Sequence, residues 1–301
     1  MKELIINKGI KWIDIPFPTD TDIQYLKNNF DFHPIILDEL IHPSDRSKTE
    51  SYDGYIYIVL HLANYNPSMR SAQQAEIDVL VTKDTLITTH YENLEALEEF
   101  EKIFLNEKLK NHITSTGQLV YYLLGEIDKF SFRQLRHIEI KVKKISEQLF
   151  KNNERKLLEE ISFLKRDIAA LGIITWPQRN ILDSLINSGT LFWGKQMKVY
   201  FNDALGEHWR VIHHLDNLKE TVVAFEETNF QLLNYRISEV IKTITITAFL
   251  ALPLTVLVSI LQIKMFSVFL ENRPNIIWLL LGIVSLTSIG LTIYFKKRKW
   301  L

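Results

Sequence analysis

The chain has 301 residues, and its 35 lysines and arginines against 36 aspartates and glutamates give a formal net charge of −1. The absence of cysteine excludes disulfides, thiolate metal sites and nucleophilic cysteine catalysis. The balanced charge gives no argument for binding nucleic acid. A content of 24% charged residues is that of a folded protein rather than a disordered one.

Residues 1–95 mix strand and helix patterns. Short apolar or alternating runs, broken by turn residues, predict strands at 4–6, 11–15, 55–60, 77–82 and 86–89. Helix patterns cover 21–30 and 34–41, the second with proline at its start. The first two strands are expected to form a hairpin. Together these elements predict an N-terminal α/β domain, a small sheet covered by helices.

Residues 96–198 show only helical periodicity, with breaks expected at Trp176-Pro177 and around Gly189. From 199 to 263 there is one proline, Pro253, and one weak helix breaker, Gly206. A single helix about 100 Å long is therefore predicted, which we term the stalk helix. A helix of that length needs copies of itself or partner helices for support, which indicates an oligomer.

Two windows, 243–263 and 275–295, contain no aspartate, glutamate, lysine or arginine. Each is long enough to cross about 30 Å of hydrocarbon as a helix. We predict two transmembrane spans, the first of them the end of the stalk helix. The alternative is a pair of buried core helices in a large soluble protein.

Basic residues set the expected orientation. The tail 296–301 is rich in lysine and arginine, and Arg236 and Lys242 precede the first span. The positive-inside rule then places both termini in the cytoplasm and the loop 264–274 outside. With no signal peptide at residues 1–10, the expected location is the cell (inner) membrane, as a multi-pass protein whose first 240 or so residues stay cytosolic.

One stripe of the first span combines apolar, small and hydroxyl side chains at helical spacing. It consists of Ile241, Ile244, Ala248, Leu252, Thr255, Ser259 and Gln262. Such a stripe is a candidate lining for a pore at the axis of a bundle. The alternative is that the threonine and serine side chains only pack helix against helix in lipid.

Several segments resemble the CorA family of divalent-cation channels, which also includes the ZntB zinc transporters. They are 46–55 and 76–90 in the α/β part, 236–245 and 253–255 at the first span, and the tail ending Lys299-Trp300-Leu301. The resemblance covers nearly the whole chain in order. It implies a funnel-shaped homopentamer in which the stalk helix continues as the pore-lining first span and the second span lies outside it.

The outer end of the first span departs from that family. Where the family has Gly-Met-Asn, this chain has Gln262, Ile263 and Lys264, and the following loop, with Arg273, carries a net charge of +1. Five lysines around a pore mouth would repel a divalent cation and favour an anion. Alternatively, Lys264 extends outward to lipid headgroups, and Gln262 supplies the polar ring through its amide oxygen.

No cofactor is predicted, and a divalent metal ion, with Mg²⁺ as one candidate, is expected only as a transported or regulatory ion whose ligands the sequence does not identify. His208, His213 and His214 lack the spacing that places two ligands on one helix face, which disfavours a metal site within one chain and leaves a site shared between subunits open. No phosphate-binding loop, nucleophile motif or zinc-protease motif is present, so an enzyme and an ATP-driven pump are not expected. The expected partners are further copies of the chain, as a homopentamer, and the lipid bilayer.

Three functions remain open from the sequence. The first is passive transport of a divalent metal ion (Mg²⁺, Co²⁺, Ni²⁺ or Zn²⁺) through a pentameric pore. The second keeps this architecture with altered selectivity, as an anion or non-selective pore. The third is a non-conducting membrane scaffold or sensor.

Overall fold

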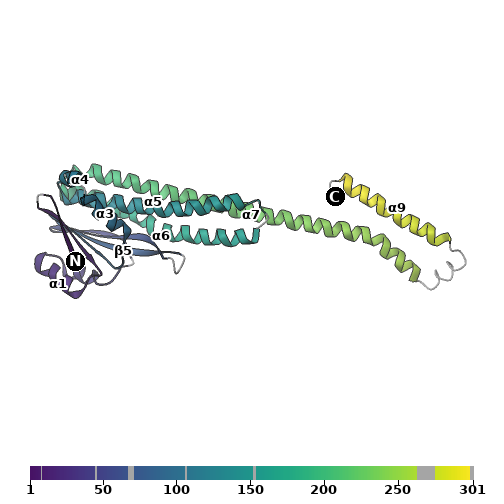
Figure 1. Ribbon diagram of the computed structural model, residues 1–301, viewed down its shortest axis with the longest axis horizontal. Helices are drawn as coiled ribbons and strands as arrows, with labels where there is room; N and C mark the ends of the chain where they lie inside the picture. Colours follow the sequence, from purple (N-terminus) through teal and green to yellow (C-terminus); the bar gives the residue numbers. More distant parts are fainter. Residues whose placement is uncertain are drawn as a thin grey trace. The chain divides into compact units, whose positions relative to one another are not determined.

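The computed structural model describes residues 1–7, 9–44, 46–66, 71–105, 107–151, 154–262 and 275–298 (Figure 1). It divides into two compact units, Met1–Glu226 and Glu227–Leu301. The first unit contains a mixed sheet with helices on both of its faces. The second contains two long apolar helices.

Six strands form one sheet in the order β1-β2-β6-β5-β4-β3. Their bounds are Lys2–Asn7, Ile10–Pro16, Lys48–Tyr52, Tyr55–Asn66, Ser71–Val81 and Thr85–His90 for β1 to β6. The predicted hairpin at the start of the chain is confirmed, since β1 pairs antiparallel with β2. The pairing of β2 with β6 is parallel, and all other pairings are antiparallel.

Alternation along the strands gives the sheet two apolar faces. In β4, Tyr57 and Val59 lie in a core with the short helices α1 (Asp20–Asn29) and α2 (Pro34–Glu39). Ile56 and Ile58 point to the opposite face, as the two-residue period of a strand requires. That second core includes residues of α3 (Glu95–Leu105) and of the three long helices that follow α4 (Glu107–His112).

The long helices are α5 (Thr116–Gln148), α6 (Glu154–Trp193) and α7 (Met197–Gln262). In the first unit they lie side by side (Figure 1) and share a core that continues beyond the sheet. Its buried residues include Leu135 and Ile138 of α5, Ile161 of α6, and Val211 and Leu215 of α7. The apolar faces of α5, α6 and α7, each at helical spacing, thus pack against one another.

The predicted breaks within α6 are wrong, because the helix runs through both positions. Pro177 removes the N–H that would bond to the carbonyl of Ile173. Ile173 is 67% exposed, so water can reach this turn. At Gly189, an added Cβ would lie 2.5 Å from the ring of Phe201 on α7. This glycine is therefore present for the close approach of α6 to α7 rather than to end a helix.

In the second unit, the end of α7 is followed by α9 (Asn275–Lys297). Both helices are long and apolar enough to cross a membrane, judged by length and composition. Only 11% of the most apolar 18-residue window of α7 and 6% of that of α9 are buried in the single chain. Core helices of a soluble protein would be mostly covered, so this exposure favours two membrane spans.

Candidate functional site: an exposed face of α7 and two buried polar clusters

The seven residues of the predicted stripe all lie on α7 and are all exposed in the single chain. Ile241, Ile244 and Leu252 are 57%, 62% and 54% exposed. Large apolar side chains exposed at this spacing form a continuous surface along one side of the helix. A surface of this kind needs a cover that the chain itself does not supply within the described residues.

The stripe faces away from the side of α7 that is covered. Between residues 241 and 262 the buried side chains are Ile246 and Leu257. At about 100° per residue they lie roughly half a turn around the helix from the middle of the stripe. Near them the ring of Phe249 lies 6.0 Å from that of Phe295 on α9. The second span therefore approaches α7 away from the stripe, which stays available to other chains.

The hydroxyl groups of the stripe already donate their protons within the helix. Thr255 Oγ1 donates to the carbonyl of Ala251 at 2.7 Å, and Ser259 Oγ donates to the carbonyl of Thr255 at 2.9 Å. Each oxygen keeps lone pairs that accept hydrogen bonds. Such groups suit the outward-pointing hydrogens of a cation's water shell and offer no donor to an anion.

Gln262 is exposed and is the last residue of α7. Its amide combines acceptor and donor capacity at the end of the stripe. Ile263, Lys264 and Arg273, which with Gln262 make up the predicted pore mouth, lie outside the described residues.

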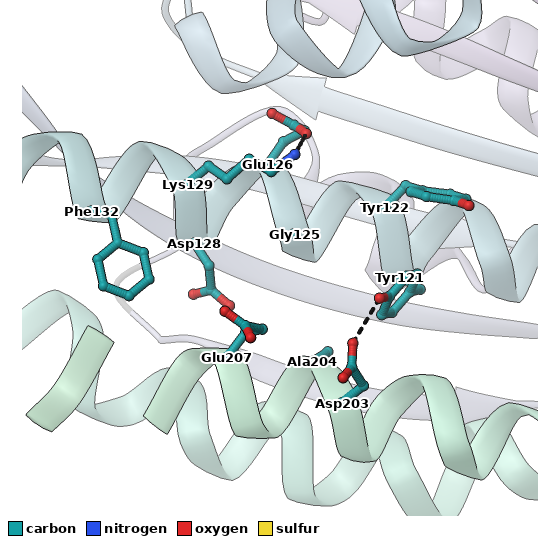
Figure 2. A pocket seen from close by; sticks show the side chains of 10 residues that line it. All are labelled: Tyr121, Tyr122, Gly125, Glu126, Asp128, Lys129, Phe132, Asp203, Ala204 and Glu207. Atoms are coloured by element: carbon teal, nitrogen blue, oxygen red, sulfur yellow. Dashed lines mark hydrogen bonds and ion pairs between the residues drawn. The ribbon is translucent and has the colours of Figure 1, made fainter. Parts of the chain in front are cut away.

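A cavity of about 320 Å³ in the first unit lies between α5 and α7. Four carboxylates line it: Glu126, Asp128, Asp203 and Glu207. Figure 2 shows the side chains of Asp128, from α5, and Glu207, from α7, pointing toward each other.

All four carboxylates already have partners. Glu126 pairs with Lys129 at 2.6 Å and Glu207 with Arg210 at 2.7 Å. Asp203 accepts a hydrogen bond from Tyr121 at 2.7 Å, and Asp128 contacts His208 at 2.8 Å. Among the residues that the structure describes, no group of three histidine, aspartate or glutamate side chains is arranged to hold a metal ion.

His208 is the buried partner of Asp128, a pairing that sequence reasoning missed. Its Nδ1 lies 2.8 Å from Asp128 Oδ1, and its Nε2 lies 3.1 Å from the carbonyl of Thr175 on α6. Both ring nitrogens therefore lie within hydrogen-bond distance of an oxygen atom. Burial raises the pKa of Asp128, and the hydrogen bond with His208 lowers it in part. The pair joins all three long helices.

The other two histidines are apart from this pair. His213 stacks on the ring of Trp209, with 5.3 Å between ring centroids. His214 Nε2 lies 3.9 Å from a carboxylate oxygen of Glu139. The structure therefore does not bring the three histidines together, in keeping with their spacing in the sequence.

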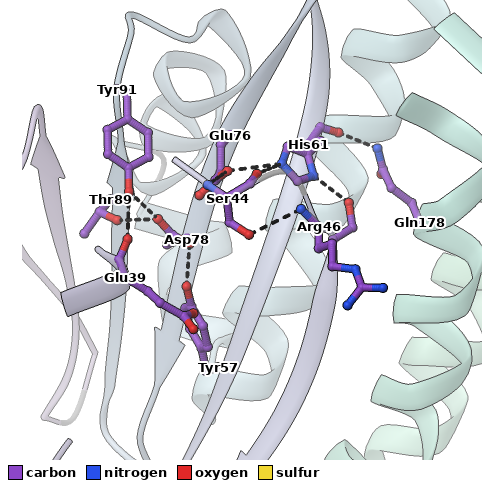
Figure 3. A network of polar contacts seen from close by, with 11 residues as sticks. Glu39, Ser44, Arg46, Tyr57, His61, Glu76, Asp78, Thr89, Tyr91 and Gln178 are labelled. Atoms are coloured by element: carbon purple, nitrogen blue, oxygen red, sulfur yellow. Dashed lines mark hydrogen bonds and ion pairs between the residues drawn. The ribbon is translucent and has the colours of Figure 1, made fainter. Parts of the chain in front are cut away.

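A second polar cluster ties the segment before β3 to the sheet (Figure 3). His61 Nε2 lies 3.1 Å from Glu76 Oε2 and 2.9 Å from the carbonyl of Ser44. The backbone N–H of Ser44 donates to the same glutamate oxygen at 2.6 Å. His61 and Glu76 face each other in the β4–β5 ladder.

Asp78, two residues along the same strand face, accepts hydrogen bonds from Tyr57, Thr89 and Tyr91. Burial and then the charge of Glu76 raise the pKa of Asp78 to about 7, from an ordinary value of 3.8. The strands that carry the resemblance in the α/β part thus meet in one buried network. No single-residue pattern in the sequence marks it, because its members come from β4, β5, β6 and the loops beside them.

Comparison with known proteins gives one consistent family. The sequence profile of a family described as "CorA-like Mg2+ transporter protein" matches residues 7–297. The cobalt/magnesium transport protein CorA of Thermotoga maritima is 23% identical over 297 residues, which cover 96% of this chain and 83% of that protein.

Two solved structures show the same fold. The complete structure of the CorA magnesium transporter from Methanocaldococcus jannaschii matches with a TM-score of 0.83 at 17% identity, over 97% of this chain and 92% of that one. The ZntB cytoplasmic domain from Vibrio parahaemolyticus matches with a TM-score of 0.59 at 16% identity, over 76% of this chain and 90% of that one. The α/β fold with a long helix and two apolar C-terminal helices, expected from the sequence, is confirmed.

Proposed function

The chain belongs to the family of CorA-like Mg²⁺ transporters, and on that premise we propose that it conducts a divalent metal ion passively across a membrane. The observation that carries the proposal is the exposed stripe of α7, which lies opposite the buried side of the same helix. Relatives that match over nearly the whole chain are named as cobalt and magnesium transport proteins. Magnesium and cobalt are therefore the first ions to test.

A single α7 helix encloses no pathway, so the proposal requires several copies around one axis. A closed ring buries each stripe against its neighbours and against the axis, which removes the exposed apolar surface from lipid and water. The family resemblance supplies the number five. In this homopentamer each copy contributes the same seven side chains, so that every position of the stripe becomes a ring.

The proposed arrangement in the membrane follows the charge distribution. Residues 1–95 and 96–198 form the cytosolic part, 199–263 the stalk and first span, and 275–295 the second span. Both termini lie in the cytoplasm and the loop 264–274 lies outside, because the basic tail 296–301 stays on the cytosolic side.

The rings differ in chemistry along the pathway. Ile241, Ile244 and Leu252 form apolar rings, which can close a pore by excluding water. Thr255, Ser259 and Gln262 form rings of acceptor oxygens toward the outer end. Mg²⁺ loses its water reluctantly and is held through that water. We propose that a hydrated cation enters past Gln262 and that the apolar rings form the gate.

Replacement of threonine at the stripe tests the role of the acceptor rings. Thr255→Val keeps the shape of the side chain and removes its oxygen. Thr292→Val is the matched control, since Thr292 on α9 makes the same bond to the carbonyl four residues earlier, at 2.8 Å. We expect Mg²⁺ or Co²⁺ flux into proteoliposomes to fall about fivefold or more for Thr255→Val, because a hydrogen-bond acceptor contributes about 1 kcal/mol, and to stay unchanged for Thr292→Val. Equal effects of the two variants would remove the stripe from the pathway.

A second candidate function follows from Lys264 and Arg273, which make the segment 264–274 positive. If Lys264 faces the axis, five lysines favour anions or reduce selectivity. Reversal potentials in planar bilayers separate the two functions. A cation-selective potential that Lys264→Asn leaves unchanged supports the divalent pathway. An anion-selective potential that Lys264→Asn abolishes supports the second candidate. No flux of Mg²⁺, Co²⁺, Ni²⁺, Zn²⁺ or chloride by an assembled preparation would instead support a non-conducting scaffold or sensor.

A further inference from the structure

A cavity of about 380 Å³ lies between the two apolar helices of the second unit. Six residues line it: Thr245 and Phe249 of α7, and Leu291, Tyr294, Phe295 and Arg298 at the end of α9 and just beyond it. None of the lining residues belongs to the stripe, and the proposed ion pathway does not use the cavity.

The walls of the cavity are apolar and aromatic. The rings of Phe249 and Phe295 lie 6.0 Å apart, and that of Tyr294 lies 5.7 Å from Phe295. The hydroxyl of Thr245 donates to the carbonyl of Ile241 at 2.8 Å, so it offers a ligand no proton. The interior therefore suits a hydrocarbon chain rather than a polar solute.

One cation stands at the mouth of the cavity. Arg298 is exposed, and its guanidinium lies 5.9 Å from the centre of the Tyr294 ring. In the part of the chain that the structure describes, no carboxylate forms an ion pair with Arg298. The helix α9 contains no acidic residue, and Lys296 and Lys297 precede Arg298. The mouth thus carries positive charge that the described residues leave uncompensated.

The position along the spans fixes the depth of the cavity. Thr245 and Phe249 lie within the first two turns of the uncharged window 243–263, and Leu291, Tyr294 and Phe295 lie within the last two turns of the window 275–295. Both sets therefore lie at the same edge of the hydrocarbon layer, where acyl chains give way to phosphate headgroups.

We propose that this cavity binds one anionic phospholipid, with an acyl chain against Phe249, Leu291 and Phe295 and the phosphate on the Arg298 guanidinium. A guanidinium pairs with phosphate through two parallel hydrogen bonds. The positive charge of Lys296, Lys297 and Arg298 selects a lipid of net negative charge over a zwitterionic one. Basic pockets between membrane helices on the cytosolic side are the sites where anionic headgroups bind. A bound lipid also contacts α7 at Thr245 and so joins the two spans of one subunit.

The test measures lipid retained by the purified full-length protein in detergent, by native mass spectrometry, during titration with dioleoylphosphatidylglycerol or dioleoylphosphatidylcholine. Arg298→Gln removes the cation that lines the cavity. Lys297→Gln is the matched control, because it removes the same charge one residue away, at a side chain that does not line the cavity. Leu291→Trp fills the cavity without changing the charge. All variants are first compared with the wild type by size-exclusion elution.

We expect the wild type to retain phosphatidylglycerol in preference to phosphatidylcholine. Arg298→Gln should weaken phosphatidylglycerol binding about tenfold or more, and Lys297→Gln about twofold at most, as for an exposed charge. If Arg298→Gln and Lys297→Gln weaken phosphatidylglycerol binding equally, the lipid is attracted by the positive surface in general and not by the cavity. That result would overturn the proposal. Equal retention of the two lipids by the wild type would also overturn it. Full binding by an assembled Leu291→Trp variant would mean that the cavity holds another occupant, such as a neighbouring subunit.

Discussion

The contact between α6 and α7 at Gly189 gives a prediction whose size follows from the structure. An added Cβ at this position lies 2.5 Å from a ring atom of Phe201 and 3.1 Å from one of Trp193. Phe201 is fully buried, so its ring has no solvent to move into. Gly189→Ala therefore overfills the core, at a cost of about 1–3 kcal/mol, partly offset by about 0.5–1 kcal/mol from the higher helix propensity of alanine.

Gly206→Ala on α7 is the matched control, because an added Cβ there meets no atom within 4 Å. The gain in helix propensity is common to both variants, so the difference between them isolates the steric cost. At roughly 3 °C per kcal/mol for a unit of this size, Gly189→Ala should unfold about 3–9 °C below Gly206→Ala. The assay is thermal unfolding of the full-length protein, followed by near-ultraviolet circular dichroism. Coincident midpoints would refute the claim that Gly189 serves helix approach.

Three further predictions concern the buried polar groups and the apolar rings. The raised pKa of Asp78, about 7 against an ordinary 3.8, means that the folded protein binds this proton more tightly than the unfolded chain. The thermal midpoint should therefore rise as pH falls from 8 to 6, and Asp78→Asn should flatten that part of the profile. Asp128→Leu and His208→Leu each break the buried pair and should each lower the free energy of unfolding in urea by about 3–5 kcal/mol. The double variant should lose less than the sum of the two single losses. Additive losses would contradict a direct pairing. Leu252→Ser places a polar side chain in a proposed apolar ring, so that water can enter the constriction, and should raise the resting Mg²⁺ flux in proteoliposomes. Leu254→Ser, on another side of α7, should leave this flux unchanged.

The strands of the α/β unit were predictable because their alternation is local. Tyr57 and Val59 on one face and Ile56 and Ile58 on the other predict a strand with two covered faces, and the structure confirms it. The parallel pairing of β2 with β6 was not predictable from such runs. It joins segments about seventy residues apart, and no local pattern specifies which strand completes a sheet.

Helix breaks were the weakest sequence inference. Pro177 and Gly189 disfavour a helix in isolation, but packing against the sheet and α7 outweighs a local cost of about 1–3 kcal/mol per residue. The buried Asp128–His208 pair could not be predicted from the sequence either, because its two members lie 80 residues apart on different helices. The stripe on α7, in contrast, depends only on helical period, and its seven residues do share one exposed face.

The most direct test of the proposed pathway uses the absence of cysteine from the natural chain. Single variants Thr255→Cys and Ser259→Cys place one thiol on the stripe, and Leu254→Cys places one on another side of the same helix. Each is reconstituted in liposomes and treated with a membrane-impermeant, charged methanethiosulfonate while Mg²⁺ flux is recorded. The stripe variants are predicted to react and lose flux, with Leu254→Cys unaffected. Reaction and block at Leu254→Cys, with the stripe variants silent, would contradict a pathway along this face of α7.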